Sequence, residues 1–494
     1  MATNSAFGSA FSLKEYRPLD QTAPCSPLVV DLDGTLVKTD LLIESLFVLI
    51  KKNPFFIVVL PFWLLKGKAY LKRQISQRVT LDVSVLPYNQ QFLDYLRVQH
   101  FQGRRLVLAT GSDERIALQV AKHLQLFDEV FASNGAVNLS GRHKLDCLVT
   151  EFGERGFDYA GNAWRDLLVW SSARKAIVVN SSQALSHRAA QVAQVELAFK
   201  GRERWPKPLA EALRLYQWAK NLLVFVPLVL AYRFSELDLL ANASLAFLAF
   251  SLCASSVYLI NDLADLPADR QHPRKRQRPF AAGELSPLWG LAAVPLLLGG
   301  SLLVSLSLPV AFLGMLAIYF LVNLAYSFRL KRIVLLDVIV LVGLYTMRIM
   351  AGSASVGLWP SAWLLAFSTF LFLSLALVKR YAELVTMSYI SKKVVQIRGY
   401  RGVDKELLAS FGSGSGYVAV LVLAMYISSG LADIHYTRHQ LIWFLCPLLL
   451  YWISYVWLIA HRGEMHDDPL VFTAKDKVSR IVILLVAIVL LIAK

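Results

Sequence analysis

Residues 251–269 read SLCASSVYLINDLADLPAD, and this stretch decides what kind of fold the chain can adopt. It closes an apolar run that starts near residue 241, and about 20 apolar residues are what a helix needs to cross a bilayer. Three carboxylates follow at once. Asp262, Asp265 and Asp269 would share one helical face, because they are spaced i, i+3 and i+7. The stretch therefore predicts a membrane-spanning helix with an acidic end.

Apolar runs of similar length continue to the C-terminus. Hydrophobic residues make up 56% of the 494-residue chain, more than a water-soluble protein of this size can bury. Lipid offers the backbone no hydrogen-bond partner, so each run has to be helical. We expect residues 201–494 to form an all-α polytopic membrane domain of nine helices, near 220–234, 241–260, 288–307, 309–327, 333–352, 361–379, 416–431, 439–460 and 478–493.

The loops between these runs alternate in charge. Those after the second, fourth, sixth and eighth runs are rich in Lys and Arg, whereas 353–360 contains neither. Basic loops stay on the cytoplasmic side, so we predict a multi-pass protein of the inner (cytoplasmic) membrane with a cytoplasmic N-terminal domain. These loops also explain the net charge of +16, and we predict no nucleic-acid partner. The first residues lack the apolar segment of a signal peptide, and the four cysteines are too scattered for a zinc site or a disulfide framework.

The N-terminal part of the chain has a different character. Residues 1–24 form a tail, and residues 25–200 read as mixed α/β sequence. Residues 28–36, LVVDLDGTL, are an apolar strand that runs into Asp31 and Asp33, which face the same side because strand side chains alternate. This geometry suits Asp31 as a nucleophile on phosphorus and Asp33 as a general acid or base. A second strand, 105–109, ends at Thr110, whose hydroxyl can hold a phosphoryl oxygen.

These motifs, followed by Lys144, Asn162 and Asp166, resemble the haloacid dehalogenase superfamily. The resemblance implies a doubly wound parallel α/β sheet with a small helical cap. It also implies phosphate contacts at Thr110 and Lys144, and a Mg²⁺ ion near Asp31, Asp33, Asn162 and Asp166. That family usually has aspartate where this chain has Asn162. The domain is thus either an active phosphohydrolase with reduced metal affinity or a degenerate, regulatory domain.

Residues 41–65 are apolar but are interrupted by KKNP at 51–54 and by Pro61. Each piece is too short to span a bilayer. Two interpretations remain open: a buried or cap helix pair, or an interfacial patch that docks the domain onto the membrane.

The acidic end of the 241–260 run is a candidate metal site. Its carboxylates and Asn261 form a dense group of hard oxygen donors that repel one another unless a cation lies among them. Mg²⁺ bridging a diphosphate fits, because Mg²⁺ takes a few carboxylates together with phosphate oxygens. The basic residues that follow, including Arg274 and Arg278, would stabilise a leaving pyrophosphate. We predict catalytic roles for Asp262 and Asp265, and metal ligands at Asn261, Asp262, Asp265 and Asp269.

This stretch resembles the UbiA superfamily of intramembrane prenyltransferases, whose first motif is NDxxDxxxD. The resemblance covers residues 205–494 and implies a nine-helix bundle with a central cavity open to lipid. Most members carry a second aspartate-rich motif after the sixth span. Here that place reads KRYAE, with Lys379, Arg380 and Glu383. A more cationic site suits a substrate that carries more phosphate.

With these cationic residues in place of the second acidic motif, the sequence resembles the phosphoribosyltransferase branch of the superfamily. It implies phosphoribosyl pyrophosphate as donor, a polyprenyl phosphate as acceptor, and displacement of pyrophosphate from ribose C1. The substrate-binding residues would be Lys220, Asn221, Arg274, Arg278, Tyr326, Lys331, Lys379, Arg380 and Glu383. The basic members of this set can equally be surface residues that fix the topology.

Two other functions stay open. The first is transfer of a polyprenyl group from its diphosphate to an aromatic or other acceptor, and the second is a transporter or scaffold. In the leading interpretation, the N-terminal domain removes a phosphate from the lipid-linked product. No oligomeric state is predicted. Arg348 lies near the outer end of the fifth span, where we expect its side chain to snorkel to the surface.

Overall fold

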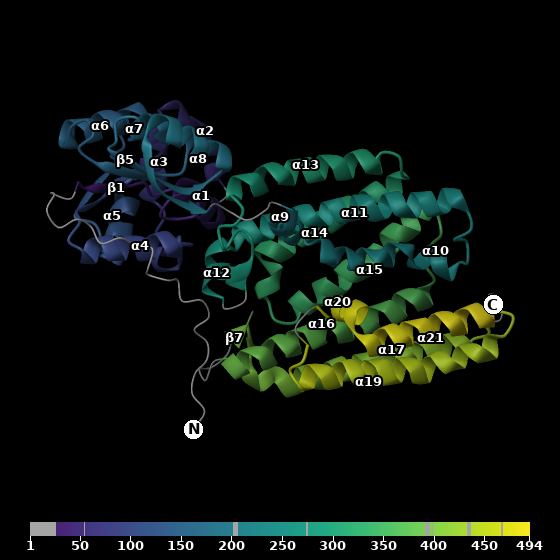
Figure 1. Ribbon diagram of the computed structural model, residues 1–494. Coiled ribbons are helices and arrows are strands. Elements are labelled where there is room, and N and C mark those ends of the chain that lie inside the picture. Colours follow the sequence, from purple (N-terminus) through teal and green to yellow (C-terminus); the bar gives the residue numbers. More distant parts are fainter. Residues whose placement is uncertain are drawn as a thin grey trace, which may run out of the picture. The chain divides into compact units, whose positions relative to one another are not determined.

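The structure, a computed structural model, describes residues 26–53, 55–200, 206–272, 275–390, 396–397, 399–431, 436–465 and 468–494. The chain divides into two compact units, Met1–Glu203 and Arg204–Lys494. The first contains a β-sheet and the second is almost entirely helical (Figure 1).

A six-stranded parallel sheet organises the N-terminal unit. Its strand order is β3-β2-β1-β4-β5-β6, so the order reverses beside the central strand β1. The expected parallel α/β sheet is thereby confirmed, although β1 is shorter than predicted and ends before Asp31. The strands are β1 (Leu28–Val30), β2 (Leu106–Asp113), β3 (Glu129–Ser133), β4 (Asp158–Gly161), β5 (Lys175–Ser181) and β6 (Gln194–Lys200).

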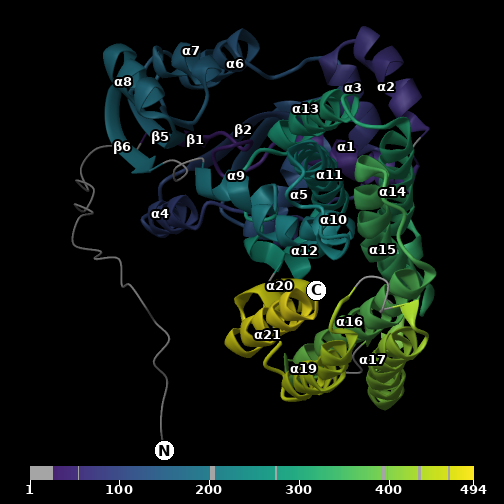
Figure 2. The ribbon, with the colours of Figure 1, turned by 90° about the vertical axis from the view of Figure 1, so that its right-hand side faces the viewer.

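Helices cover both faces of this sheet because the strands are apolar on both sides. Leu28 and Val30 of β1 point into one core with α4 (Gln90–Phe101) and α5 (Glu114–Leu124). Val29 points into the other core, with α6 (Arg142–Phe152), α7 (Leu167–Trp170) and α8 (Gln183–Val192). Figures 1 and 2 show α6 and α7 on one side of the strands and α4 on the other.

The chain between β1 and β2 forms further helices before it reaches α4. Asp40 caps α1 (Leu41–Lys52) by accepting from the backbone N–H groups of Leu42 and Ile43. The α1 helix buries Leu41 and Leu49, as expected of a cap helix, but α2 (Phe56–Leu65) buries no residue. The α3 helix (Lys68–Ser76) returns to the sheet and contacts β2. Residues 41–65 are therefore not a uniformly buried helix pair.

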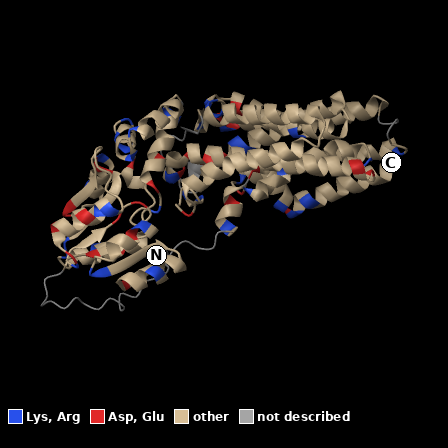
Figure 3. Ribbon diagram, turned by 90° about the horizontal axis from the view of Figure 1, so that it is seen from above, with Lys and Arg blue, Asp and Glu red and all other residues tan. Residues whose placement is uncertain are grey.

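The C-terminal unit is a helical bundle. Among its described residues, seven helices are long and apolar enough to cross a membrane. They are α11 (Leu237–Ala264), α13 (Pro287–Ser305), α14 (Val310–Phe328), α15 (Leu336–Val356), α16 (Ala362–Ile390), α17 (Lys405–Ser428) and α19 (Leu445–His461) with the short η8 (His439–Phe444) before it. The long helices are mostly free of charged residues (Figure 3).

Two of the nine expected spans are too short to be counted among these seven. The first consists of η4 (Leu215–Phe225) and α10 (Val226–Leu230), and the last is α21 (Lys477–Ala493). The first begins as a 3₁₀-helix, a form that seldom extends beyond a few residues. The structure thus supports a multi-pass bundle but not the count of nine.

The acidic end of α11 is not one continuous helix. The α11 helix stops at Ala264, and Asp265 leads into α12 (Leu266–Gln271). The reason is Pro267, which lacks an N–H group to bond Leu263 and disfavours helical geometry at the residue before it. The predicted single face for Asp262, Asp265 and Asp269 is therefore broken after the first carboxylate.

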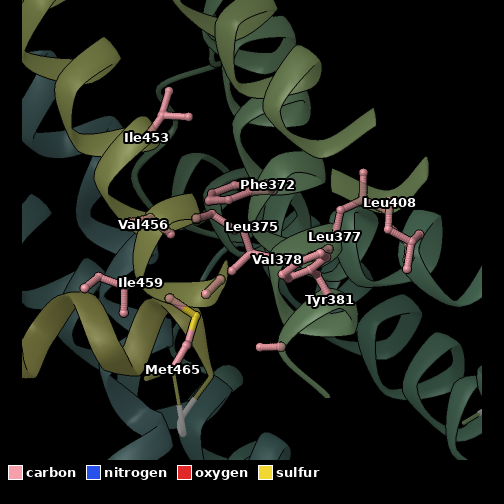
Figure 4. Close-up of a cluster of buried hydrophobic side chains, with 14 of the residues drawn as sticks. Phe372, Leu375, Leu377, Val378, Tyr381, Leu408, Ile453, Val456, Ile459 and Met465 are labelled. Atoms are coloured by element: carbon pink, nitrogen blue, oxygen red, sulfur yellow. The ribbon is translucent and has the colours of Figure 1, made fainter. Parts of the chain in front are cut away.

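The two larger apolar clusters of the bundle join its long helices. Side chains of α16 and α19, including Phe372, Leu375 and Val456, point toward one another in the larger cluster (Figure 4). The other joins α11, α14 and α15. At Gly352 of α15 an added Cβ would lie 2.0 Å from the carbonyl oxygen of Val224 in η4, so only glycine permits this close approach.

Replacing Gly352 with valine should therefore push η4 away from α15. We expect the free energy of unfolding in detergent to fall by about 1–3 kcal/mol, the usual effect of overpacking. Gly343→Val on the same helix is the control, because nothing lies within 4 Å of its Cβ position. Equal thermal melting temperatures for the two variants would contradict this account of the contact.

Candidate active sites in the two units

Polar side chains gather where β1, β2 and β4 end in the N-terminal unit. Asp31 and Asp33 follow β1, Thr110 lies in the last part of β2, and Asn162 follows β4. Parallel strands bring their carboxyl ends to one edge, and ligands of such sheets usually bind where the strand order reverses. Gly34, with φ +79°, makes the turn possible, since a Cβ at this position would lie 2.0 Å from Nδ2 of Asn162.

Lys144 reaches the proposed nucleophile from α6. Its Nζ donates to Oδ1 of Asp31 at 2.7 Å and to the Tyr159 hydroxyl at 3.0 Å. That hydroxyl donates in turn to Oδ1 of Asp166 at 3.0 Å. Burial raises the pKa of Asp31 to about 7, despite the opposing charge of Lys144. The predicted residues Asp31, Lys144 and Asp166 thus form one buried chain.

Asp33 is held separately, by donors from both sides. Its Oδ1 accepts from the backbone N–H of Leu41 at 2.9 Å, and its Oδ2 accepts from Oγ of Ser112 at 2.6 Å and of Thr110 at 3.4 Å. Burial raises its pKa to about 6, and the charge of Asp40 adds to this shift. In this structure Thr110 therefore supports Asp33.

Sequence reasoning missed Lys72, on α3. Its Nζ donates to the carbonyl of Gly111 and, at 2.7 Å, to Oδ1 of Asn138. Burial lowers its pKa, while Asp33 and Asp40 oppose this shift. Lys72 precedes Gly111 by 39 residues and belongs to no local motif. Only folding brings α3 to this edge of the sheet, so the sequence alone did not reveal the contact.

The donor set of the N-terminal unit fits a divalent cation only partly. No group of three or more His, Cys, Asp or Glu side chains suited to a metal occurs in the part of the chain that the structure describes. Asn162 Oδ1 accepts from Thr35 at 3.2 Å, and Asp166 Oδ2 accepts from two backbone N–H groups. Burial is the main cause of the raised pKa values of Asp31 and Asp33, so a cation beside these carboxyls would favour their charged forms.

In the C-terminal unit, two acidic side chains of the NDxxDxxxD motif meet at one point. Nη1 of Arg278 lies 3.0 Å from Oδ1 of Asp262 and 2.6 Å from Oδ2 of Asp269. Arg214 donates to the same oxygen of Asp262 at 2.5 Å. The guanidinium of Arg278 therefore lies where two of the predicted ligands could share a cation, and the metal site itself stays a prediction.

The third carboxylate of the motif pairs with a different cation. Asp265 accepts from Lys331, whose Nζ also donates to Oδ1 of Asn261 at 3.0 Å. The break at Asp265 explains why this side chain does not join the other two. Arg274 lies outside the described residues, and Arg214 was missed because it precedes the first apolar run without a motif.

A second charged centre joins Lys220 of η4 to Lys379 of α16. Their Nζ atoms lie 2.8 Å and 2.7 Å from the same oxygen, Oδ2 of Asp468. The Tyr345 hydroxyl donates to this carboxylate at 3.3 Å. Burial alone would raise the pKa of Asp468, but the two lysines outweigh burial and hold that pKa well below its usual range. Asp468 lies in a loop predicted only to be basic, so its role was not foreseen.

Arg380 belongs to a third group, in which Arg380 and Asp337 are buried and Glu383 is partly exposed. It donates to Oδ2 of Asp337 at 2.5 Å, to Oε2 of Glu383 at 2.8 Å and to the Tyr326 hydroxyl at 2.8 Å. Tyr400 donates to the other oxygen of Asp337 at 2.7 Å. All three guanidinium nitrogens thus already have protein acceptors, which favours a supporting role for Arg380 over direct phosphate binding.

Arg348 does not snorkel, contrary to expectation. Its side chain is buried and donates to Oδ1 of Asn221 at 2.9 Å and to the Tyr319 hydroxyl at 3.0 Å. Asn221 also donates to Ser251 at 2.9 Å. Arg348 lies twelve residues into α15, about 18 Å from the helix start, and internal partners were available at that depth. Asn221 is thereby engaged in packing η4 against α11 and α15.

Residues 222–492, which include the NDxxDxxxD motif and the Lys379 segment, match the UbiA prenyltransferase family. The chain belongs to this family. The match covers more than half of the chain and lies entirely within the C-terminal unit.

Several proteins are similar to this UbiA-family chain. The uncharacterized protein y4nM of Sinorhizobium fredii is 36% identical over 456 residues, which cover 92% of this chain and 88% of that protein. The nodulation protein NoeC of Azorhizobium caulinodans is 35% identical over 56% of this chain and 89% of its own length. Decaprenyl-phosphate phosphoribosyltransferase of Mycolicibacterium smegmatis is 39% identical over 180 residues, 36% of this chain and 57% of that enzyme.

Among solved structures, a UbiA homolog from Archaeoglobus fulgidus bound to DMAPP and Mg²⁺ is similar. It is 17% identical, with a TM-score of 0.44, and the comparison covers 57% of this chain and 98% of that one.

The buried Asp337–Arg380 pair should be essential to the stability of the helical unit. Asp337→Asn would leave the guanidinium without its buried counter-charge, and breaking such a pair typically costs about 3–5 kcal/mol. Asp238→Asn, at an exposed position near the start of α11, is the control. Chemical denaturation in detergent should separate the two variants, and equal stability would contradict the structural role assigned here.

Proposed function

We propose that the C-terminal unit catalyses Mg²⁺-dependent transfer of a phosphoribosyl group from phosphoribosyl pyrophosphate to a polyprenyl phosphate. The observation that carries this proposal is a lysine pair: Lys379 stands where most of the superfamily has an acidic motif, and Lys220 of η4 meets it at Asp468. A second cationic centre beside an acidic one suits two reactants that both carry phosphate. The similarity to decaprenyl-phosphate phosphoribosyltransferase supports the same assignment.

The NDxxDxxxD cluster would hold the donor. Asp262 and Asp269 converge on Arg278, and Asp265 and Asn261 converge on Lys331. Mg²⁺ bound among these carboxylates would neutralise the diphosphate and its developing negative charge. Arg278 and Lys331, released from their carboxylates, would then donate to the phosphate oxygens.

The lysine pair would hold the acceptor phosphate. Asp468 keeps the two ammonium groups on one oxygen, so their donors are already gathered at a single point. An oxyanion of the lipid phosphate can replace this carboxylate with little rearrangement. Arg380, fixed by Asp337 and Glu383, would keep the end of α16 in position.

The reaction then needs one displacement. An oxygen of the acceptor phosphate forms a bond to ribose C1, and the bond between C1 and the pyrophosphate oxygen breaks. The electron pair of that bond leaves with pyrophosphate. The protein contributes orientation and charge stabilisation, the two effects that dominate reactions in which anions meet.

Membership in the UbiA prenyltransferase family favours a second candidate, transfer of a prenyl group from its diphosphate. The NDxxDxxxD cluster would bind the diphosphate of the donor in either reaction. The lysine pair distinguishes phosphoribosyl transfer from prenyl transfer, because an aromatic acceptor has no phosphate for the lysines to bind.

The full chain in lipid nanodiscs, supplied with Mg²⁺, polyprenyl phosphate and ribose-labelled phosphoribosyl pyrophosphate, should transfer label to the lipid fraction. Asp262→Asn should reduce this rate at least about a hundredfold. Lys379→Met should raise the KM for polyprenyl phosphate about tenfold to a hundredfold, the effect of losing a hydrogen bond between charged groups.

Lys477→Met is the matched control, because this lysine is exposed at the start of α21. Its kinetics should equal those of the wild type. Absence of label in lipid, together with transfer from a prenyl diphosphate to an aromatic acceptor, would replace the leading proposal with the second candidate.

For the N-terminal unit we propose hydrolysis of a phosphate monoester, with Asp31 as nucleophile and Asp33 as general acid or base. The contact of Lys144 with Asp31, together with the buried position of Asp31, supports this assignment. A natural substrate is the phosphoribosyl lipid, because its remaining 5-phosphate is a monoester. Lys72, whose Nζ reaches the Gly111 carbonyl from α3, would be a further substrate contact.

Asp31→Asn should accumulate the phosphorylated lipid product, whereas the wild type should yield the dephosphorylated form. The substitution keeps size and hydrogen bonding but removes the nucleophile. Asp146→Asn, exposed on α6, should behave like the wild type. Mass spectrometry of the lipid extract decides, and identical products from all three proteins would exclude this role.

A further inference from the structure

The α2 helix is the most exposed apolar element of the N-terminal unit. None of its residues is buried, and Leu65 is 85% exposed, Phe62 64% and Val58 58%. The other helices of this unit either bury apolar residues against the sheet or, like α3, lie close to it. The exposure of α2 is therefore a local feature that the sheet does not explain.

The sequence of α2, FIVVLPFWLL, contains no polar residue. A helix that is apolar on all sides is normally enclosed by protein or by lipid, because water around it is unfavourable. Ten residues extend only about 15 Å, half of the roughly 30 Å hydrocarbon core, so α2 cannot cross a bilayer. Its length suits insertion into one leaflet.

The charges around α2 are all of one sign. No acidic residue occurs from position 45 to position 81, a stretch with seven Lys or Arg residues. Lys51 and Lys52 end α1, and Lys66 and Lys68 follow α2, with all four exposed. Lysines at the ends of an apolar segment can bury their stems beside lipid while their ammonium groups reach anionic headgroups. An acidic protein surface could also bind these lysines, but it would not account for the apolar helix between them.

The same chain is itself expected to lie in a bilayer. Its described residues include seven helices suited to crossing a membrane, and only five residues separate the end of β6 at Lys200 from the start of α9 (Pro206–Ala212). The N-terminal unit is thus tethered to the lipid phase, and insertion of α2 involves no further loss of translational freedom.

We propose that α2 is a monotopic membrane anchor that inserts into one leaflet of the bilayer and is fixed there by the flanking lysines. Bound in this way, the N-terminal unit keeps a fixed face toward the membrane. The proposal does not depend on the enzymatic assignment of either unit.

Nitroxide labels test the proposal on the full chain in vesicles that contain anionic phospholipid. The native cysteines, Cys25, Cys147, Cys253 and Cys446, are first replaced by alanine, and a single cysteine is placed at Phe62 or Leu65. Both positions are exposed, so the substitutions leave the core intact. Collision of the label with oxygen, which is concentrated in lipid, is compared with collision with a water-soluble nickel chelate.

Labels at both α2 positions should collide at least about fivefold more with oxygen, relative to nickel, than a label at Leu118, which is exposed on α5. Two results would overturn the proposal. A nickel collision rate equal to that of Leu118 would place α2 in water. Low rates with both reagents would mean that protein covers α2, either the helical unit or a second copy of the chain.

Discussion

Buried charges impose the main constraint on the helical unit. A charged side chain inside a bundle cannot be left without a partner, because neither lipid nor a dry protein interior solvates it. The Asp337–Arg380 pair satisfies this condition at the end of α16, with Tyr326 and Tyr400 completing the hydrogen bonds. Its ion pair ties α15 to α16, while the tyrosines add α14 and the segment after α16. Both charged centres proposed to bind substrate are built from these elements and their neighbours.

The same constraint explains why basic and acidic groups alternate at the candidate sites. Asp262, Asp265 and Asp468 each accept from at least one Arg or Lys. A site prepared in this way is neutralised before substrate arrives. Phosphate and Mg²⁺ can then exchange partners with the existing ion pairs, so that no bare charge has to be buried at any step.

Much of the fold could be predicted from the sequence, because its signals are local. Long apolar runs predicted the helices of the bundle, and strands followed by carboxylates predicted the parallel sheet. The site was predictable where it forms a contiguous motif, as at Asp262. Asp468 and Lys72 could not be found, because each meets its partners only through tertiary folding, across 248 residues in the case of Lys220 and Asp468. The break of the helix at Asp265 was predictable from Pro267, but the regular spacing of the carboxylates masked it.

The position of β1 also has a consequence for the order of folding. This strand occupies residues 28–30, yet it pairs with β2 at residues 106–108 and with β4 at residues 158–160. The central part of the sheet therefore cannot form until the ribosome has synthesised β4. As a result β1, the first strand to be synthesised, waits longest for its partners. Sheets with such distant pairings form slowly. The first long apolar segment of the bundle, η4 with α10, begins only at Leu215, so the ribosome can release the whole sheet-forming region before membrane insertion starts.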